Sequence, residues 1–222
     1  MVAPRIVETE NGLQGNDNAV NYDQMMRKSR DDGHLYTDQI IQSGIVHGTV
    51  LEIGTGPGYL GLEWLRKTVD TILKGIDISA EMVAMAEKNA KDYGFSGDRA
   101  AFTVGDAHQI PFPGNTFDAV FSNSTLHEWN EPERVLEEIH RVLKPEGRFY
   151  ISDLRRNMPF FVKNYMKRLI PKDQVPGLMA AIQSAYTVDE AKAIMKKSKF
   201  TRFKTSVNPF SLMITGAKSV SD

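Results

Sequence analysis

The sequence of 222 residues predicts an α/β fold built on a mostly parallel sheet. Two observations lead to this prediction: short apolar runs alternate with segments of helical periodicity, and the first of these runs ends in a glycine-rich turn. Hydrophobic residues make up 41% of the chain, which is enough to bury a substantial core without covalent cross-links. We therefore expect a single domain that spans residues 1–222.

Four apolar runs in the first half of the chain are separated by turns or helices, as parallel strands require. The predicted strands cover residues 49–53, 72–78, 101–104 and 117–122. Helices are predicted over residues 59–67 and from the N-cap residue Ser79 to Gly94, a residue type that ends helices. This alternation is typical of βαβ units.

The remaining elements are less regular. A helix begins near Pro132 and ends at residues 144–147, and a fifth strand follows over residues 148–152. Residues 154–186 are rich in Met, Phe and Lys and contain three prolines, so we expect a small helical cap there. Residues 187–190 spell a capping box for one more helix. An antiparallel hairpin at the sheet edge is expected from two last strands near residues 203–207 and 210–216.

The composition excludes several classes of function. The chain contains no cysteine, which rules out disulfides, thiolate metal sites and cysteine nucleophiles, and no metal site is expected. The formal net charge of -1 disfavours nucleic acid and anionic membranes as partners. Residues 1–21 lack the apolar core of a signal peptide, and no apolar run approaches the roughly 18 residues of a membrane span. We expect a cytoplasmic protein, and its oligomeric state stays open.

Candidate binding residues follow the predicted strands, because ligands of open parallel sheets bind beyond the carboxyl ends of the strands. Those positions hold Gly54, Asp77, Asp106 and Asn123. A glycine lets the backbone approach a ligand closely, and an aspartate accepts hydrogen bonds from hydroxyl or amino groups. The sequence therefore predicts a binding site at this edge of the sheet.

The glycine turn Gly54-Thr55-Gly56-Pro57-Gly58 has the spacing G-x-G-x-G. A dinucleotide-binding fingerprint requires a third glycine where Tyr59 stands, so the turn argues against a nicotinamide-dependent oxidoreductase. Exposed N–H groups at the start of the following helix favour a carboxylate or a phosphate. The alternative is a tight strand-to-helix turn that binds no ligand.

The two aspartates suit the parts of a nucleoside. Asp77 can accept hydrogen bonds from both hydroxyls of a ribose, or it can simply stabilise the start of a helix. Asp106 can accept from an adenine amino group while the Ala107 N–H meets a ring nitrogen, or it can form a turn. Asn123 lies near the expected reacting group, and it too has an alternative role as a turn residue.

Four segments occur in a characteristic order and spacing: Val50 to Gly58, Gly75 to Ser79, Gly105 to Ala107 and Arg141 to Pro145. Together they resemble the class I S-adenosylmethionine (SAM) dependent methyltransferases, and most closely their ubiquinone/menaquinone-biosynthesis-like small-molecule group. The resemblance implies a Rossmann-like, seven-stranded, mostly parallel sheet with an antiparallel last strand, helices on both faces and a small helical cap. It also implies SAM as the cofactor, S-adenosylhomocysteine as its product and a small molecule as the methyl acceptor.

The resemblance further implies roles for individual residues. Asp77 would hold the ribose, Asp106 the adenine and Glu52 the methionine end of SAM. Residues 1–45 would form a helical segment that covers the cofactor, and residues 154–186 would form the cap. The implied cofactor-binding residues are Glu52, Gly54, Thr55, Gly56, Gly58, Tyr59, Asp77, Ile78, Met82, Gly105, Asp106, Ala107 and Asn123.

Two residues are candidates for catalysis. Methyl transfer from a sulfonium depends on alignment and on exclusion of water, and some acceptors also need a base. His127, in the loop after the fourth strand, is the candidate base, although it could instead shape the pocket. Tyr22 could cover the cofactor or touch the acceptor, or it could be an ordinary surface residue.

The cap leaves the acceptor unidentified. Its apolar residues could line an acceptor pocket or form the core face of a helix; they are Met158, Phe160, Phe161, Tyr165, Met166 and Leu169. Basic residues in the same segment keep an RNA methyltransferase as an alternative, although no added RNA-binding module accompanies them. The other alternative is a SAM-binding scaffold or sensor without catalysis.

Overall fold

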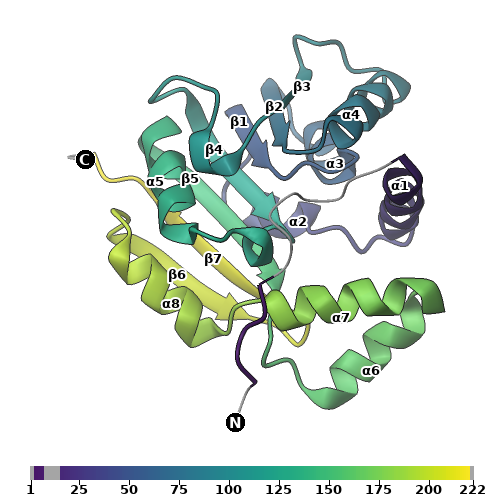
Figure 1. Cartoon of the computed structure of the whole chain (residues 1–222). Coiled ribbons are helices and arrows are strands. Elements are labelled where there is room, and N and C mark those ends of the chain that lie inside the picture. The colour runs from purple at the N-terminus through teal and green to yellow at the C-terminus, as the bar shows by residue number, and fades with distance from the viewer. Residues whose placement is uncertain (1–2, 8–15, 221–222) are drawn as a thin grey trace.

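The computed structural model describes residues 3–7 and 16–220. Its strands are β1 (Gly48–Ile53), β2 (Thr71–Asp77), β3 (Ala100–Val104), β4 (Phe117–Asn123), β5 (Leu143–Leu154), β6 (Arg202–Val207) and β7 (Ser211–Ala217). Within this part of the chain they form one seven-stranded sheet in the order β3-β2-β1-β4-β5-β7-β6 (Figure 1). β1 to β5 are mutually parallel, whereas β7 is antiparallel to both β5 and β6. From β1 the chain first adds β2 and β3 on one side and then β4 and β5 on the other, so the strand order reverses between β1 and β4. Open parallel sheets bind ligands at such a reversal, beyond the carboxyl ends of the strands.

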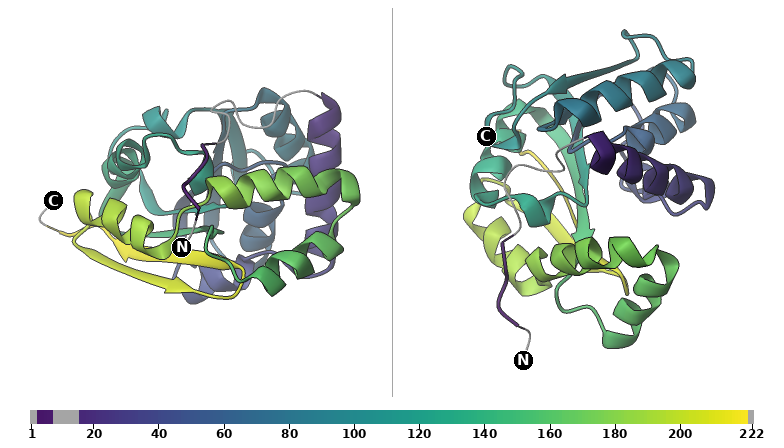
Figure 2. Two further views of the ribbon diagram at one scale, coloured as in Figure 1. Left: turned by 60° about the horizontal axis from the view of Figure 1, so that its bottom comes forward. Right: turned by 45° about the vertical axis from the view of Figure 1, so that its right-hand side comes forward.

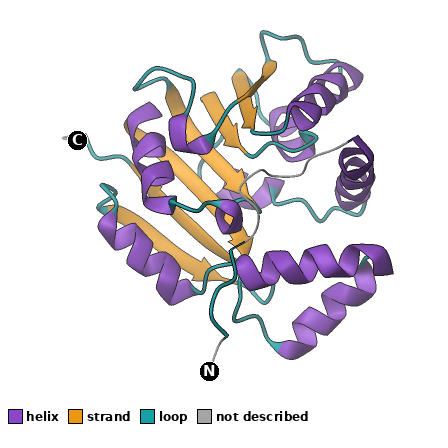
Figure 3. Cartoon of the chain, in the orientation of Figure 1, coloured by secondary structure: helices purple, strands orange, loops and turns teal. Residues whose placement is uncertain are grey.

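Helices pack on both faces of the sheet (Figure 3). One face carries α2 (Thr37–Gln42), α3 (Tyr59–Lys67) and α4 (Ala80–Asp92). The other face carries α5 (Pro132–Val142) and α8 (Val188–Lys197). Each face therefore has its own apolar core, and the sheet is held between them.

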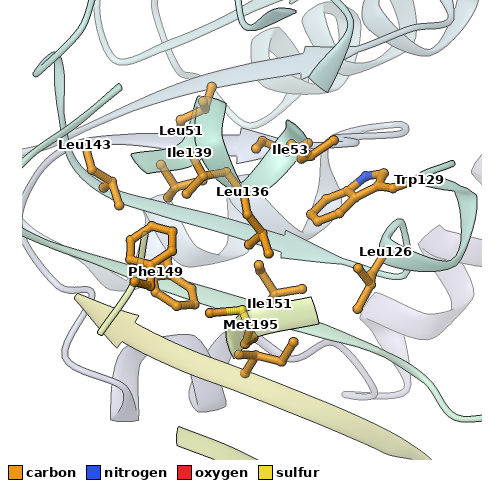
Figure 4. Packing of buried hydrophobic residues seen from close by; sticks show 14 of the residues in the cluster. Leu51, Ile53, Leu126, Trp129, Leu136, Ile139, Leu143, Phe149, Ile151 and Met195 are labelled. Atoms are coloured by element: carbon orange, nitrogen blue, oxygen red, sulfur yellow. The ribbon is translucent and has the colours of Figure 1, made fainter. Parts of the chain in front are cut away.

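The larger core lies between the sheet and helices α5 and α8 (Figure 4). Leu136 and Ile139 project from α5 and Met195 from α8, and they meet Phe149 and Ile151 of β5. Each of these side chains is buried, and complete burial stabilises the fold by roughly 1.5–3 kcal/mol per side chain. This packing fixes β4 and β5, whose carboxyl ends carry part of the site described below.

Two further parts of the chain lie beside the carboxyl ends of the strands. Helix α1 (Asn16–Asp31) packs against α3 and α4, and α6 (Phe160–Leu169) and α7 (Val175–Ser184) form a hairpin that stands off from the sheet (Figure 2). Met158, Val162 and others give this hairpin a small core of its own. Short 3-10 turns complete the fold: η1 (Ala107–Gln109), η2 (Leu126–Glu128) and η3 (Lys172–Gln174).

The expected N-terminal helical segment is only partly helical. α1 and α2 fall within residues 1–45, whereas residues 3–7 form no helix and run beside α7, where the Ile6 N–H donates to the Gln183 carbonyl at 3.3 Å. Residues 8–15 lie outside the described residues. Among the helices that the structure describes, none is long and apolar enough to cross a membrane.

Most predicted boundaries hold, and one is wrong. The helix over residues 59–67 is confirmed, and the Ser79 hydroxyl caps α4 by accepting the Met82 N–H at 3.3 Å. Helix α5 does end before residues 144–147, at Val142, but β5 begins at residue 143 and not at the predicted residue 148. The pairing register of β4 and β5 shifts there, and Glu146 adopts a φ of 62°. A bulge in the strand therefore takes up the residues that read as a helix stop.

Candidate active site

The glycines of the turn between β1 and α3 leave its backbone uncovered by side chains, and we call residues 54–58 the glycine cradle. Gly54, Gly56 and Gly58 have φ angles of 69°, 50° and 84°, a region that favours glycine. A Cβ on Gly54 would overlap the methyl group of Thr125, and a Cβ on Gly56 would lie 3.3 Å from the Tyr22 ring. Side chains would therefore fill the space where the turn, the loop after β4 and helix α1 come together.

We expect Gly54→Ala to lower the free energy of unfolding by about 2 kcal/mol, because left-handed backbone and overpacking each cost about 1 kcal/mol or more. Urea unfolding measures this difference. Gly97→Ala is the matched control, since a Cβ there meets nothing within 4 Å. Thr125→Ser should restore part of the loss in the Gly54→Ala background. Equal stability of the two alanine variants would show that the turn is not close-packed.

Asp77 holds the glycine turn against the start of α4. Its Oδ2 accepts the Gly56 N–H at 2.8 Å, and its Oδ1 accepts the Ser79 N–H at 3.0 Å. Burial raises the pKa of Asp77, and the surrounding backbone N–H groups act in the opposite direction. A carboxylate has about four acceptor positions, so Asp77 can accept a further hydrogen bond from a ligand.

Glu52 lies beneath the same turn. It is buried, and its Oε2 accepts a hydrogen bond from the Thr55 hydroxyl at 2.9 Å. Burial raises the pKa of Glu52 to about 8, against the hydrogen bond from Thr55, and the negative charge of Asp77 adds to the rise. A cation placed here would reverse that shift, because an opposite charge favours the ionised carboxylate.

The loop after β3 has local hydrogen bonds of its own. Asp106 Oδ1 accepts the His108 N–H at 2.8 Å and lies 2.7 Å from His108 Nδ1. Partial burial acts to raise the pKa of Asp106, but these contacts outweigh it and hold that pKa below its ordinary value. The Gly105 N–H donates to the Asp77 carbonyl at 2.9 Å. The two acidic loops are thereby joined, with Ala107 beginning η1 beside them.

Tyr22 reaches over the glycine turn from α1, as its contact with Gly56 requires. Removal of its hydroxyl from water raises the Tyr22 pKa. Four negative side chains add to the rise, those of Glu128, Asp77, Asp153 and Glu52. All four carboxyl groups act on the same hydroxyl, so a cationic ligand beside Tyr22 would be favoured.

Tyr59 contributes its side chain to a different contact. Its hydroxyl donates to Asp23 Oδ1 at 3.0 Å and accepts from Arg27 Nε at 3.1 Å, so the ring joins α3 to α1. The Asn89 amide donates to the same Asp23 oxygen at 3.2 Å. Only the backbone of Tyr59, at the start of α3, is placed to serve the turn.

Three other predicted residues lie along the same edge. Ile78 is exposed next to Asp77, and Met82 is buried in the first turn of α4. Asn123 ends β4, where its Oδ1 accepts a hydrogen bond from the Ser152 hydroxyl at 2.6 Å. The structure thus brings the predicted residues after β1, β2 and β4 to one edge of the sheet.

His127 forms a buried pair that the sequence analysis missed. The imidazole Nδ1 of His127 lies 2.9 and 3.0 Å from the two carboxylate oxygens of Asp153. The backbone N–H of His127 also donates to Asp153 Oδ2, at 2.6 Å. Both residues are buried. This geometry assigns the imidazole proton to Nδ1 and leaves the basic nitrogen at Nε2, which lies 4.0 Å from Glu128 Oε1.

The N-terminal segment also contacts this loop. Arg5 Nη2 donates to the His127 carbonyl at 2.8 Å, its Nε donates to the Ser184 carbonyl at 2.5 Å, and its guanidinium lies over the Tyr186 ring at 4.2 Å. Arg5 therefore connects the His127 loop to the cap. Within the described residues, no cluster of His, Asp and Glu side chains is arranged to hold a metal ion.

Comparison with known proteins decides the family. A methyltransferase-domain profile matches residues 51–151. The demethylmenaquinone methyltransferase of Thermotoga maritima is 31% identical over 183 residues, which cover 75% of this chain and 75% of that protein. This chain belongs to the class I SAM-dependent methyltransferases. An uncharacterised methyltransferase of Bacillus subtilis, YdaC, is 33% identical over 142 residues, or 62% of this methyltransferase and 76% of the relative.

The fold of this methyltransferase is found in solved structures. A candidate SAM-dependent methyltransferase of Methanococcus maripaludis superposes with a TM-score of 0.74 at 24% identity, over 94% of this chain and 98% of that one. The predicted Rossmann-like seven-stranded sheet is thereby confirmed. As a member of this family the protein has SAM as its cofactor. The glycine cradle and the four carboxyl groups that act on Tyr22 fit a cationic sulfonium ligand.

A cavity of about 410 Å³ lies between the N-terminal segment and the cap of the methyltransferase. Apolar residues such as Met158, Met179 and Ile182 line it together with Arg156 and Lys163. Of the predicted cap residues, Met158 is buried and Met166 packs on the cap core, whereas the remaining four are exposed: Phe160, Phe161, Tyr165 and Leu169. The predicted set is thus divided between the core of the cap and its surface.

Proposed function

We propose that this methyltransferase transfers the methyl group of SAM to a small aromatic acceptor that loses a proton, and that His127 takes up that proton. The observation that carries the proposal is the buried His127–Asp153 pair, which lies at the same strand edge as the glycine turn. A histidine whose Nδ1 is held by a carboxylate is oriented to act as a base through Nε2.

The cofactor would lie across the ends of β1 to β4. We assign the ribose hydroxyls to Asp77, the adenine to Asp106 with the Ala107 N–H and Ile78, and the methionine end to Glu52 and Asn123. SAM supplies an electrophilic methyl group on a positively charged sulfur. The backbone at Gly105 and in the glycine turn would lie against the cofactor, and Met82 would contact it from the first turn of α4. The residues of the turn in this assignment are Gly54, Thr55, Gly56, Gly58 and Tyr59.

Tyr22 and α1 would cover the bound cofactor. The Tyr22 ring already faces Gly56, so closure of α1 over the turn would exclude water from the reacting atoms. Residues 1–45 and the cap of residues 154–186 are in this proposal parts of one domain that encloses the site. Arg5 supports the arrangement, since it joins the His127 loop to the cap.

The acceptor class is proposed from the relatives and the cavity together. The Thermotoga maritima relative and a Bdellovibrio bacteriovorus relative are named for demethylmenaquinone and for ubiquinone/menaquinone biosynthesis. The mostly apolar cavity beside the cap, with Arg156 and Lys163 at its wall, suits an apolar ring that carries oxygen atoms. We therefore propose a quinol-type aromatic ring as the acceptor.

Calorimetric titration with SAM, S-adenosylhomocysteine and NADH tests the cofactor site. The wild-type protein should bind SAM and S-adenosylhomocysteine but not NADH. Asp77→Asn should weaken SAM binding by about 30-fold, because hydrogen bonds to a charged group contribute roughly 1.5–3 kcal/mol. The exposed Asp92→Asn on the far end of α4 is the control and should bind normally. Equal affinity of Asp77→Asn and wild type would remove Asp77 from the site.

A further inference from the structure

The outer face of α6 carries exposed apolar side chains that have no role in the methyltransferase site. Phe160, Phe161, Tyr165 and Leu169 are 78%, 73%, 52% and 50% exposed. Phe161, Tyr165 and Leu169 recur every four residues and therefore lie along one side of the helix, and Phe160 is exposed at its first position. Val162 and Met166 face the core of the cap. The Tyr165 ring lies 6.3 Å from the exposed Phe210 ring, so the apolar surface continues onto the turn between β6 and β7. Exposed patches of this kind mark interaction sites.

The same segment carries a strong positive charge. Residues 154–186 contain six basic side chains and one acidic side chain, Asp173, and have a net charge of +5 although the whole chain has a net charge of -1. Lys167, Arg168 and Lys172 form no ion pair with any residue that the structure describes. The small net charge of the whole chain therefore conceals a basic cap, and this surface can attract anionic lipids.

We propose that α6 is a docking surface for a lipid bilayer that contains anionic lipids, with its aromatic side chains at the interface and its basic side chains against the headgroups. A helix with apolar aromatic residues on one face and Lys or Arg beside them is suited to lie in the plane of a membrane surface. Basic side chains near such a surface contribute attraction to anionic headgroups. The hairpin of α6 and α7 stands off from the sheet, which leaves the outer side of α6 open to a flat surface (Figure 2).

Two other occupants fit the surface less well. A second copy of the chain would bring the patch against itself in a symmetric dimer, and two caps of charge +5 would then repel each other. Single-stranded RNA stacks its bases on aromatic rings, but the exposed Leu169 on the same side of α6 offers no ring. Anionic lipid satisfies both the aliphatic and the basic side chains.

The docking would bring the acceptor cavity close to lipid, because Lys163 of α6 lines that cavity. This consequence rests on the proposed function, since it assumes that the acceptor binds in the cavity. The docking itself does not, because it concerns only the outer face of α6. A binding assay without turnover therefore separates the failure of one proposal from the failure of the other.

Vesicle flotation of the full chain tests the docking. We expect flotation with vesicles of equal parts phosphatidylcholine and phosphatidylglycerol, little flotation with phosphatidylcholine alone, and a decrease as salt is added. The paired substitution Phe160→Ser with Phe161→Ser should lower vesicle binding by about tenfold or more, because burial of apolar surface is lost. Lys167→Glu with Arg168→Glu should have an effect of about the same size.

Matched controls change equally exposed residues elsewhere. Val69→Ser removes an apolar side chain that is 78% exposed at the far end of α3, and Lys196→Glu with Lys199→Glu reverses two exposed charges near α8. Both controls should float like the wild type. All variants should bind SAM normally, which shows that they are folded. The proposal would be overturned if the wild type did not float, or if the α6 variants floated as well as the wild type. It would also be overturned by a dimer that the Phe variants abolish, or by displacement of the vesicles by polyuridylate.

Discussion

Replacement of His127 by Gln is expected to lower kcat by about two to four orders of magnitude while the affinity for SAM stays within about twofold, because general-base catalysis contributes on this scale. Gln keeps a polar side chain of similar size in the loop but cannot take up a proton. Single-turnover kinetics with a quinol-type acceptor and calorimetry with SAM separate the two effects. A variant that retains its rate within about threefold would show that the acceptor needs no base.

Asp153 should behave as a positioning residue behind His127. Asp153→Asn leaves an oxygen to accept the Nδ1 proton but removes the charge that supports the protonated imidazole, so we expect kcat to fall by about a hundredfold. Added imidazole should restore part of the rate in His127→Ala and none in Asp153→Asn, because only the first variant lacks the base itself. Rescue of both variants, or of neither, would contradict these separate roles.

The cofactor half of the site could be predicted because its contacts are local. A left-handed turn between a strand and a helix favours glycine, and Asp77 accepts N–H groups from Ser79 two residues away and from the turn itself. Such contacts follow from residue type and spacing, so a single sequence contains them. The helix start at Ser79 was predictable for the same reason.

The catalytic half could not be completed in this way. His127 and Asp153 are separated by 26 residues, and Arg5 reaches the His127 carbonyl across 122 residues. Their contacts depend on β4 and β5 being neighbours in the sheet and on the path of the N-terminal segment. One signal was available: Asp153 is the last but one residue of β5, at the same edge of the sheet where Asp77 ends β2. An acid at the end of a strand beside the His127 loop was a candidate partner.

The direction of single side chains was also beyond the sequence. Tyr59 adjoins the glycine cradle, yet its ring packs toward Asp23 of α1, because α1 covers that side of α3. Asp106 stands where the adenine is expected, yet one of its oxygens is already engaged by His108. Proximity along the chain therefore identifies the loops of the site more reliably than it identifies the atoms that face the ligand.

Replacement of Glu52 by Gln is expected to stabilise the cofactor-free protein at alkaline pH. The pKa of Glu52 is about 8 in the folded protein, because of burial, against an ordinary value of 4.5. Between these values the folded protein keeps a proton that the unfolded chain releases, so this carboxyl makes stability fall as pH rises from about 4.5 to about 8. Above pH 8 the full cost of the buried charge is present, on the order of 5 kcal/mol at about 1.4 kcal/mol per pKa unit.

Urea unfolding at several pH values measures this difference directly. Glu52→Gln and wild type should have similar free energies of unfolding near pH 4.5, and the variant should become progressively more stable than wild type toward pH 8.5. Gln can still accept the Thr55 hydroxyl, so the comparison isolates the charge. The exposed Glu137→Gln is the control and should follow the wild type at every pH. A difference that does not grow with pH would show that Glu52 is ionised in the folded protein.

The same carboxyl should couple SAM binding to proton release. A cationic group placed beside Glu52 favours the ionised form, so in wild type the affinity for SAM should rise by up to about tenfold per pH unit from pH 6 to 8. Glu52→Gln should bind SAM more weakly and with little dependence on pH. Calorimetry in two buffers of different ionisation enthalpy counts the released proton. Unfolding and binding report on the same group independently. If the free energy of unfolding changed with pH while the affinity for SAM did not, Glu52 would lie away from the charged end of the cofactor.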